Sequence, residues 1–237
     1  MNQRPAALVT GAARRVGRQI ALSLAQAGYD VAITYQGSKS EAEEVASSIG
    51  RISHQAAAIQ ADLTRADVAD SVYREVFSAF GRLDVLVNNA SLFQPGDDAE
   101  TIHRMMALHF ESPLRLCRAF EKQLRAARGH VVNMLDLLAE KPMPKYAAYC
   151  ASKAALWNLT LTLARELAPE VTVNGIAPGV IEWPNDYSEE QKQQYLRRVP
   201  LARAGTPKEA ADAVLFFTRD GYVTGQILRL DGGRSLA

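Results

Sequence analysis

Cysteine is scarce in this sequence: two residues, Cys117 and Cys150, occur among 237. Two cysteines are too few for the disulfide framework of a secreted protein, so a reducing, cytoplasmic location is expected. The N-terminus lacks the long hydrophobic core and the small-residue cleavage site of a signal peptide. No apolar run approaches the roughly 18 residues that a membrane span requires. We therefore expect a soluble cytoplasmic protein without a membrane partner.

An excess of either charge is also lacking. The 27 Lys and Arg residues balance 26 Asp and Glu, for a formal net charge of +1, and the basic pairs are short and scattered. A nucleic-acid partner is therefore not expected, because surfaces that bind nucleic acid concentrate positive charge. We predict no metal site either. With 48% hydrophobic and 22% charged residues, the composition is typical of a globular protein.

Short apolar segments alternate with helical patterns along the whole chain. Strands are expected at 6–10, 30–35, 56–61, 85–88, 130–135, 171–176 and 227–230. Helices are expected up to about 27, from a capping box at Ser40 and Glu43, and at 67–80, 102–128, 149–167, 189–197 and 207–218. Strands that are apolar on both faces and alternate with helices indicate a parallel sheet covered on both sides. No linker or repeat divides the chain, so residues 1–237 are predicted to form a single α/β, doubly wound Rossmann-type domain with about seven strands.

The first predicted strand runs into a turn with the sequence TGAARRVG at residues 10–17. Ligands of such sheets bind at the carboxyl ends of the strands, near the point where the strand order reverses. Gly11 permits a tight turn, Gly17 lets the helix pack close to the strand, and free N–H groups at the helix N-terminus suit a pyrophosphate. Arg15 occupies the position that is usually the central glycine of such a turn. A plain strand–turn–helix is the alternative interpretation, but the position at the first junction favours a cofactor site.

The end of the second predicted strand indicates which cofactor is used. An NAD enzyme usually carries an acidic residue there to bind the ribose 2′-hydroxyl, but residues 35–40 (YQGSKS) contain none. A 2′-phosphate would instead meet Arg14 or Arg15, Ser38 and the N-terminus of the second helix, which suit a dianion. We therefore predict NADP(H), with Tyr35 and Gln36 among its contacts. The alternative is a solvated loop beside two surface arginines.

Tyr149 and Lys153 lie one turn apart on the same face of a predicted helix. A cation at that distance stabilises a phenolate and lowers the pKa of the tyrosine toward the working pH, as general acid–base catalysis requires. A tyrosine four residues before a lysine is commonplace, so the pair needs support from the rest of the chain.

That support comes from a set of motifs. The Thr-Gly turn, Asp62-Leu63, Asn88-Asn89-Ala90, Tyr149 with Lys153, residues 174–179 (NGIAPG) and residues 231–233 (DGG) occur in this order. Together they resemble the short-chain dehydrogenase/reductase pattern over nearly the whole chain. The resemblance implies that the cofactor is bound by Gly11, Arg14, Arg15, Val16, Tyr35, Gln36, Ser38, Asp62, Leu63, Asn89, Ala90, Tyr149, Lys153, Pro178 and Gly179. Asp62 and Leu63 would contact the adenine, whereas Pro178 and Gly179 would flank the nicotinamide.

Three departures from that pattern narrow the choice. Asp136 occupies the position of the catalytic serine, thirteen residues before Tyr149, and His109 replaces the asparagine of the family's proton relay. Arg15 replaces a glycine. Arginine in the turn and aspartate at the serine position resemble the pteridine reductases, including the bacterial dihydromonapterin reductases. In that branch Ser91 and Phe93 would contact the pterin, as would Arg15, Asp136 and Tyr149.

The chemistry agrees with this resemblance. An ionised Asp136 would repel the oxyanion that forms when a ketone accepts hydride, whereas a serine would stabilise it. Reduction of a pterin C=N bond needs a proton at a ring nitrogen, which Tyr149 and Asp136 could supply. Plainer interpretations stay open: Asp136 as a strand-end cap, His109 as a satisfied helix residue, and Phe93 as lid packing.

We therefore predict an NADPH-dependent pteridine or dihydropterin reductase, with dihydrofolate as a further candidate substrate and with Asp136, Tyr149 and Lys153 as catalytic residues. A carbonyl (ketone) reductase of the same superfamily is the first alternative, and a non-catalytic NADP(H)-binding sensor is the second. The loop at 181–205 is expected to shape the substrate site. The resemblance also implies a homotetramer built on the Tyr149 helix and its neighbour.

Overall fold

The computed structural model describes residues 4–52, 55–183, 187–219 and 221–237. The strands are β1 (Ala6–Val9), β2 (Asp30–Tyr35), β3 (Ala56–Gln60), β4 (Val85–Asn88), β5 (His130–Met134), β6 (Thr172–Pro178) and β7 (Ile227–Leu230). The longer helices are α1 (Arg15–Gln26), α2 (Lys39–Ile52), α3 (Val68–Phe80), α4 (Ala99–Met106), α5 (Ser112–Ala127), α6 (Ala147–Glu166), α7 (Glu189–Leu196) and α8 (Pro207–Phe217). Short helical turns span Ala107–Glu111, Leu137–Ala139 and Arg234–Leu236.

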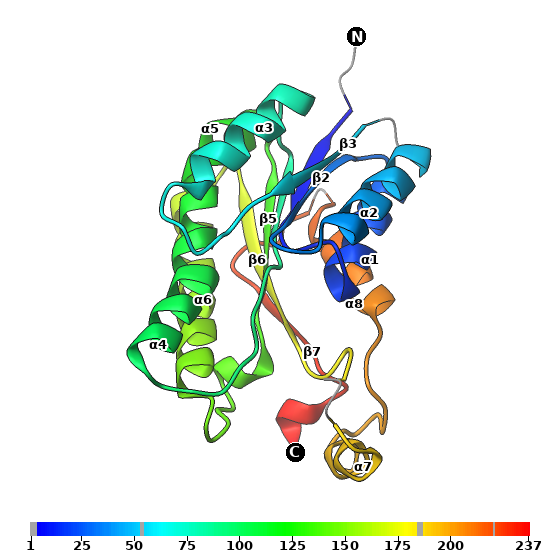
Figure 1. Cartoon of the computed structure of the whole chain (residues 1–237), viewed down its shortest axis with the longest axis vertical. Coiled ribbons are helices and arrows are strands. Elements are labelled where there is room, and N and C mark those ends of the chain that lie inside the picture. The colour runs from blue at the N-terminus through cyan, green and yellow to red at the C-terminus, as the bar shows by residue number, and fades with distance from the viewer. Residues whose placement is uncertain (1–3, 53–54, 184–186, 220) are drawn as a thin grey trace.

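Within the described part of the chain, all seven strands pair in parallel in the order β3-β2-β1-β4-β5-β6-β7. Helices α1, α2 and α8 cover one face of the sheet, and α3, α5 and α6 cover the other (Figure 1). Every residue of β1, β2, β4 and β5 is buried, as expected for strands between two helical layers. The predicted single α/β Rossmann-type domain is confirmed.

Two local predictions differ from the structure. The capping box expected at Ser40 and Glu43 is wrong, because α2 already begins at Lys39 and the carbonyl of Ser38 accepts the N–H of Ala42. The helix expected over 102–128 is interrupted by a π-helical turn at Ala107–Glu111, between α4 and α5. Such turns carry one more residue than an α-helical turn and are frequent at functional sites.

A polar chain fixes α6 against the middle of the sheet. Asn88 of β4 donates its side-chain N–H to Oδ1 of Asn133 at 2.7 Å, and Asn133 of β5 donates to Oγ1 of Thr160 on α6 at 2.9 Å. These side chains are buried, where a hydrogen bond left unmade is costly. The register of α6 on the sheet is therefore set by polar partners as well as by apolar packing.

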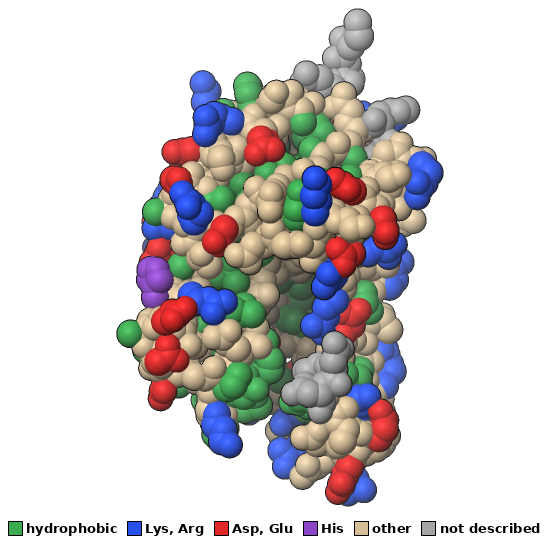
Figure 2. Space-filling model, in the orientation of Figure 1, with side chains coloured by type: hydrophobic (Ala, Val, Ile, Leu, Met, Phe, Trp, Pro, Cys, Tyr) green, Lys and Arg blue, Asp and Glu red, His purple; other side chains and the backbone are tan. Residues whose placement is uncertain are grey.

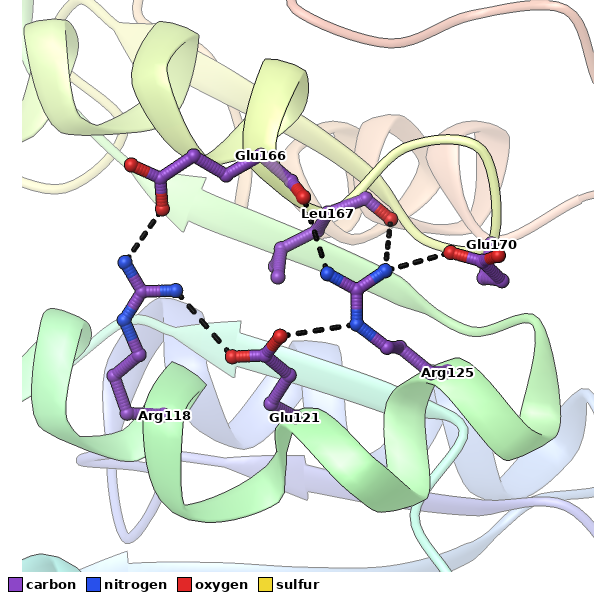
Figure 3. Close-up of polar contacts among 6 residues, drawn as sticks. All are labelled: Arg118, Glu121, Arg125, Glu166, Leu167 and Glu170. Atoms are coloured by element: carbon purple, nitrogen blue, oxygen red, sulfur yellow. Dashed lines mark hydrogen bonds and ion pairs between the residues drawn. The ribbon is translucent and has the colours of Figure 1, made fainter.

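The far end of α6 is held by a network of charges from α5 (Figure 3). Arg125 donates to the carbonyl oxygens of Glu166 and Leu167 at 3.1 and 3.2 Å, and to the carboxylate of Glu170 at 2.6 Å. A cation near the last carbonyls of a helix satisfies groups that have no intrahelical partner. This network defines where α6 ends relative to α5.

Among these described segments, no helix combines the length and the apolar character needed to cross a bilayer.

Candidate active site

The carboxyl ends of the strands enclose a cavity of about 480 Å³ at the point where the strand order reverses, between β1 and β4. The molecule is hollowed on the face shown in Figure 2, with hydrophobic side chains inside the hollow. Thr10 and Asn89 join the two strand ends. Oγ1 of Thr10 accepts the backbone N–H of Asn89 at 2.9 Å, and the Asn89 side chain donates to the carbonyl of Thr10 at 2.8 Å. Asn89 thus holds the floor of the cavity together.

The glycine turn after β1 is shaped for close approach. Gly11 has a φ of +63°, and a Cβ there would lie 2.8 Å from Cα of Ala90. A Cβ on Gly17 would lie 2.5 Å from Nδ2 of Asn89. The N-cap residue of α1, Arg14, makes no side-chain cap, and the first turn of α1 carries no acid. Its N–H groups are thus not taken by a cap or repelled by a carboxylate, which fits the pyrophosphate of a dinucleotide.

Arg15 occupies the position where the family pattern has a glycine, and its backbone is in the left-handed region that favours glycine, with a φ of +53°. Its Nε donates to Oε2 of Glu182 at 2.8 Å, and its Nη2 donates to the carbonyl of Glu182 at 3.1 Å. The two residues are 167 positions apart. The arginine therefore bridges the cofactor turn and the segment after β6 across the mouth of the cavity.

The residues expected at the adenosine end lie at or after the ends of β2 and β3, on the β2 side of β1. The Gln36 carbonyl accepts the side-chain N–H of Gln60 at 3.1 Å, and the carboxylate of Asp62 accepts the hydroxyl of Thr64 at 2.7 Å. Hydrogen bonds from Thr64 lower the pKa of Asp62, so this carboxyl stays ionised. Arg14 is ion-paired with Glu41, in the first turn of α2.

Not every predicted cofactor residue reaches the cavity. Those that line it are Gly11, Arg14, Arg15, Val16, Asn89, Tyr149, Lys153, Pro178 and Gly179. Those that lie outside its lining are Tyr35, Gln36, Ser38, Asp62, Leu63 and Ala90. Ala90 lies beside Asn89 after β4, where its N–H donates to Oγ1 of Thr10. The other five residues belong to the adenosine end, so one elongated ligand would be needed to touch both groups. A dinucleotide has that shape.

Asp136 and Tyr149 form the central polar pair of the cavity. The phenol of Tyr149 donates to Oδ2 of Asp136 at 2.6 Å. Oδ1 of Asp136 accepts the N–H of Leu138 at 2.8 Å, so Asp136 also caps the short turn at Leu137–Ala139. Asp136 is therefore both a cap and a partner of Tyr149, because it uses a different oxygen for each contact.

Burial sets the pKa values of this pair. Loss of solvent raises the pKa of Asp136, although the Tyr149 hydroxyl and the Leu138 N–H oppose the shift. Burial also raises the pKa of Tyr149, and the charge of Asp136 raises it further. Both groups therefore hold a proton more firmly than they would in water. The expectation that Lys153 lowers the pKa of Tyr149 toward the working pH is wrong for this structure, because burial and the charge of Asp136 raise it.

Lys153 lies on the next turn of α6 and is fully buried. Its Nζ donates to the carbonyl of Met134 at 2.9 Å and lies 5.8 Å from the centroid of the Tyr149 ring. Burial lowers the pKa of Lys153 to about 8, against the opposing pull of Asp136. The ammonium is thus available near neutral pH and is lost at moderately alkaline pH.

His109 lies in the π-helical turn and is buried against Tyr149, with the two ring planes at 89°. Its Nδ1 is 2.8 Å from Oγ of Ser152, and its Nε2 is 3.0 Å from Oγ of Ser91. Burial, together with the charge of Lys153, lowers the pKa of His109 well below its ordinary value, so the ring is neutral. His109 is satisfied by these partners, as the plainer interpretation expected, yet one of them, Ser91, lines the cavity.

Phe93 lines the cavity beside Tyr149. One face of its ring stacks on Tyr146, with centroids 4.4 Å apart and planes at 9°. The edge contact with Tyr149 has a centroid distance of 4.9 Å. The Phe93 side chain is 40% exposed, which leaves apolar ring surface for a flat ligand.

The segment after β6 closes the cavity on its other side. The lining residues that the sequence analysis did not identify include Met143, Val180, Ile181, Glu182, Tyr195 and Arg234. Tyr195 lies on α7, inside the predicted 181–205 loop, and the guanidinium of Arg234 lies 5.6 Å from its ring centroid. Residues 184–186 of that loop lie outside the described residues. The alternation of elements gave no signal for Tyr195, because α7 buries none of its residues.

Comparison with known proteins places this geometry in a family. Residues 11–235 match the family described as Enoyl-(Acyl carrier protein) reductase. The chain is 38% identical to the 3-oxoacyl-acyl-carrier-protein reductase FabG of Staphylococcus aureus, over 98% of this chain and 99% of that protein. It is 34% identical to Pteridine reductase 1 of Leishmania tarentolae, over 98% of this chain and 96% of that protein.

A solved structure extends the comparison. The FolM Alternative dihydrofolate reductase 1 of Brucella canis, complexed with NADP, superposes with a TM-score of 0.90 at 37% identity, covering 98% of this chain and 95% of that one. Fold and relatives define the chain as an oxidoreductase that uses a nicotinamide cofactor. It belongs to the short-chain dehydrogenase/reductase superfamily.

Proposed function

We propose that this protein is an NADPH-dependent pteridine reductase that reduces a C=N bond of a pterin or dihydropterin, with dihydrofolate as a further candidate substrate. The observation that carries the proposal is the 2.6 Å hydrogen bond from Tyr149 to Asp136, at the position where the superfamily pattern has serine. The similarity to Pteridine reductase 1 and to the FolM protein supports it.

The cofactor is proposed to be NADP(H). Arg14 and the N-terminus of α2 offer positive charge and N–H groups at the end of β2, where residues 35–40 carry no acid. Bound NADPH would supply the hydride. The residues expected to hold it are the cavity group and the adenosine-end group described above.

The protein's own part is to deliver the proton. Hydride addition to the carbon of a C=N bond leaves the electron pair on nitrogen, and one proton completes the reduction. Tyr149 is proposed as the donor, with Asp136 beside it as the group that returns a proton from water to the phenol. Lys153 would steady the phenolate by its charge while the proton is away.

Substrate binding is assigned to other residues that line the cavity. Phe93 offers a ring face for stacking, and Ser91 and Arg15 offer polar contacts at the edge of the ligand. The segment at 181–205 is proposed to shape the outer part of the site. We further propose that the protein is cytoplasmic and assembles as a homotetramer through α6 and its neighbour.

A carbonyl reductase is the second candidate, because the FabG relatives share 38% identity with the chain. The charge of Asp136 argues against it. An ionised carboxylate near a carbonyl oxygen that becomes anionic raises the barrier, whereas a hydroxyl donor lowers it.

The deciding experiment follows NADPH absorbance against dihydrobiopterin, dihydromonapterin, dihydrofolate, biopterin and a simple ketone. Wild-type protein is compared with Asp136→Ser, and Asp70→Ser on the exposed face of α3 serves as a matched control. Pterin turnover that falls in Asp136→Ser and persists in Asp70→Ser would support the proposal. Ketone turnover alone, rising in Asp136→Ser, would replace it with a carbonyl reductase, and NADPH binding without any turnover would indicate a sensor.

A further inference from the structure

The polar surroundings of His109 define which of its nitrogens carries the proton. The backbone N–H of Leu92 points at Nε2 from 3.3 Å. A backbone amide can only donate, so Nε2 must accept and carries no proton. If Nε2 carried a proton, two N–H donors would face each other and repel.

The other side of the ring gives the same answer independently. The hydroxyl of Ser152 donates to the carbonyl of Tyr149, one turn back on α6, at 2.7 Å. A hydroxyl has one proton, so the contact of 2.8 Å between Ser152 and Nδ1 of His109 requires Nδ1 to be the donor. Both sides therefore select the neutral ring with its proton on Nδ1.

This tautomer fixes the direction of the Ser91 hydroxyl. With no proton on Nε2, the contact of 3.0 Å between Nε2 and Oγ of Ser91 is attractive only if Ser91 donates. The Tyr149 phenol oxygen is the rival acceptor within reach of this hydroxyl. A neutral phenol oxygen is a weaker acceptor than an imidazole nitrogen, so His109 takes the proton and the lone pairs of Ser91 face the cavity.

We propose that His109 is a positioning residue that makes Ser91 an acceptor toward the bound substrate, and that the site thereby selects heteroaromatic ligands with N–H donors on the edge that meets Ser91. This inference rests on the proposed function and names the chemistry of its substrate class. Ser91 lines the cavity, so this acceptor lies on its wall. A ligand edge that carries an amino group matches such a wall, whereas a bare carbonyl oxygen meets lone pairs.

The first test measures the tautomer directly, by ¹⁵N NMR of histidine-labelled wild-type protein with NADP⁺ bound. His109 is identified by the signal that disappears in His109→Gln. The expected spectrum has a protonated, pyrrole-type Nδ1 and an unprotonated, pyridine-type Nε2. A protonated Nε2 would overturn the inference.

The second test uses two variants that each keep one half of the ring's contacts. The amide of His109→Gln reaches the place of Nε2 and can still accept from Ser91, whereas that of His109→Asn reaches only the place of Nδ1 and Ser152. For a 2-aminopterin substrate, KM should stay within about 3-fold of wild type in the Gln variant and rise about 10-fold in the Asn variant, with a smaller change in kcat. Equal KM values in the two variants would overturn the role of His109.

A ligand comparison completes the design. A 2-methyl analogue of the pterin, which lacks the amino donor, should bind about equally well to wild type and to Ser91→Ala, whereas the 2-amino compound should lose about 5- to 10-fold in affinity on that substitution. Equal losses for both ligands would refute the acceptor role of Ser91. The expected tautomer without turnover of any pterin would refute the proposed function instead, and pterin turnover with a protonated Nε2 would refute this inference alone.

Discussion

Tyr149 and Asp136 lie thirteen positions apart in sequence and share a hydrogen bond of 2.6 Å inside the cavity. The short turn at Leu137–Ala139 brings them together, because Asp136 caps that turn and α6 follows shortly after it. The pair therefore belongs to one continuous segment. It can be tested without disturbing the sheet.

Replacing Tyr149 with Phe removes the proposed proton donor and leaves the ring packing in place. Turnover of the pterin substrate should fall by about 10²- to 10⁴-fold, which is the usual contribution of a general acid. NADPH binding, measured by fluorescence, should change little. Tyr222→Phe, a fully exposed tyrosine, is the control. Turnover within a few-fold of wild type would show that another group donates the proton.

The pH dependence of turnover should report Lys153. Burial lowers its pKa to about 8, so the ammonium is present below that pH and is lost as the pH rises through it. Since the neutral amine stabilises no phenolate, kcat/KM should fall on the alkaline side of about 8. A pH–rate profile from 6 to 10 measures this, because kcat/KM reports groups of the free enzyme.

Lys141 provides the control for that profile. It also lines the cavity, but it is not part of the Tyr149 pair. The alkaline fall should persist in Lys141→Gln. A flat profile in the wild type, or loss of the fall in Lys141→Gln, would contradict the role given to Lys153.

Because the backbone at Arg15 is left-handed, two substitutions there should differ in their effect on the stability of the fold but not in their effect on substrate binding. In Arg15→Gly the φ of +53° costs nothing, whereas in Arg15→Ala the Cβ keeps the strain. Both variants lose the contact with Glu182. The glycine variant should therefore be more stable than the alanine variant by about 1 kcal/mol, or roughly 2–4 °C in Tm for a chain of this size.

Substrate binding should weaken equally in the two variants, although their stabilities differ. Both variants should show a KM for the pterin raised by about 10-fold, the scale of one hydrogen bond to a charged group. Thermal unfolding and steady-state kinetics on the same samples provide both readouts. If the two variants were equally stable, the strain at residue 15 would be negligible, and an unchanged KM would remove Arg15 from the substrate site.

Cofactor preference should depend on Arg14. In Arg14→Ala the ratio of NADPH to NADH affinity should fall by about 10- to 100-fold, because a charge-assisted contact to the 2′-phosphate is lost. Arg18→Ala tests a neighbouring exposed arginine that does not line the cavity, and it should leave the ratio unchanged. Isothermal titration with both cofactors decides the matter. Equal losses for NADPH and NADH would place Arg14 away from the 2′-phosphate.

The sequence predicted those parts of the site that follow from spacing within one element. Tyr149 and Lys153 are one helical turn apart, and Asp136 is close along the chain. The contact of Arg15 with Glu182 crosses 167 positions and depends on how the segment after β6 folds back. No local pattern encodes that path, so the sequence predicted the 181–205 loop as a whole but singled out neither Glu182 nor Tyr195.

His109 marks a different limit. The sequence predicted that residues 102–128 are mostly helical, and a regular helix gives each residue a regular direction. The π-helical turn at Ala107–Glu111 changes those directions, and from this turn the ring contacts both Ser91 and Ser152. In the sequence His109 departs from the family pattern, but its partners follow from the turn.

That turn also constrains how this region can vary among descendants of the gene. A π-helical turn holds one residue more than an α-helical turn, so it is equivalent to a single-residue insertion. Deleting one residue there would restore a continuous helix and rotate everything on one side of it by about 100°. Either His109 would lose its contacts with Ser91 and Ser152, or Leu116 and Phe120 would leave the core against which α5 packs. Changes in the length of this segment are therefore not tolerable in lineages that keep the activity.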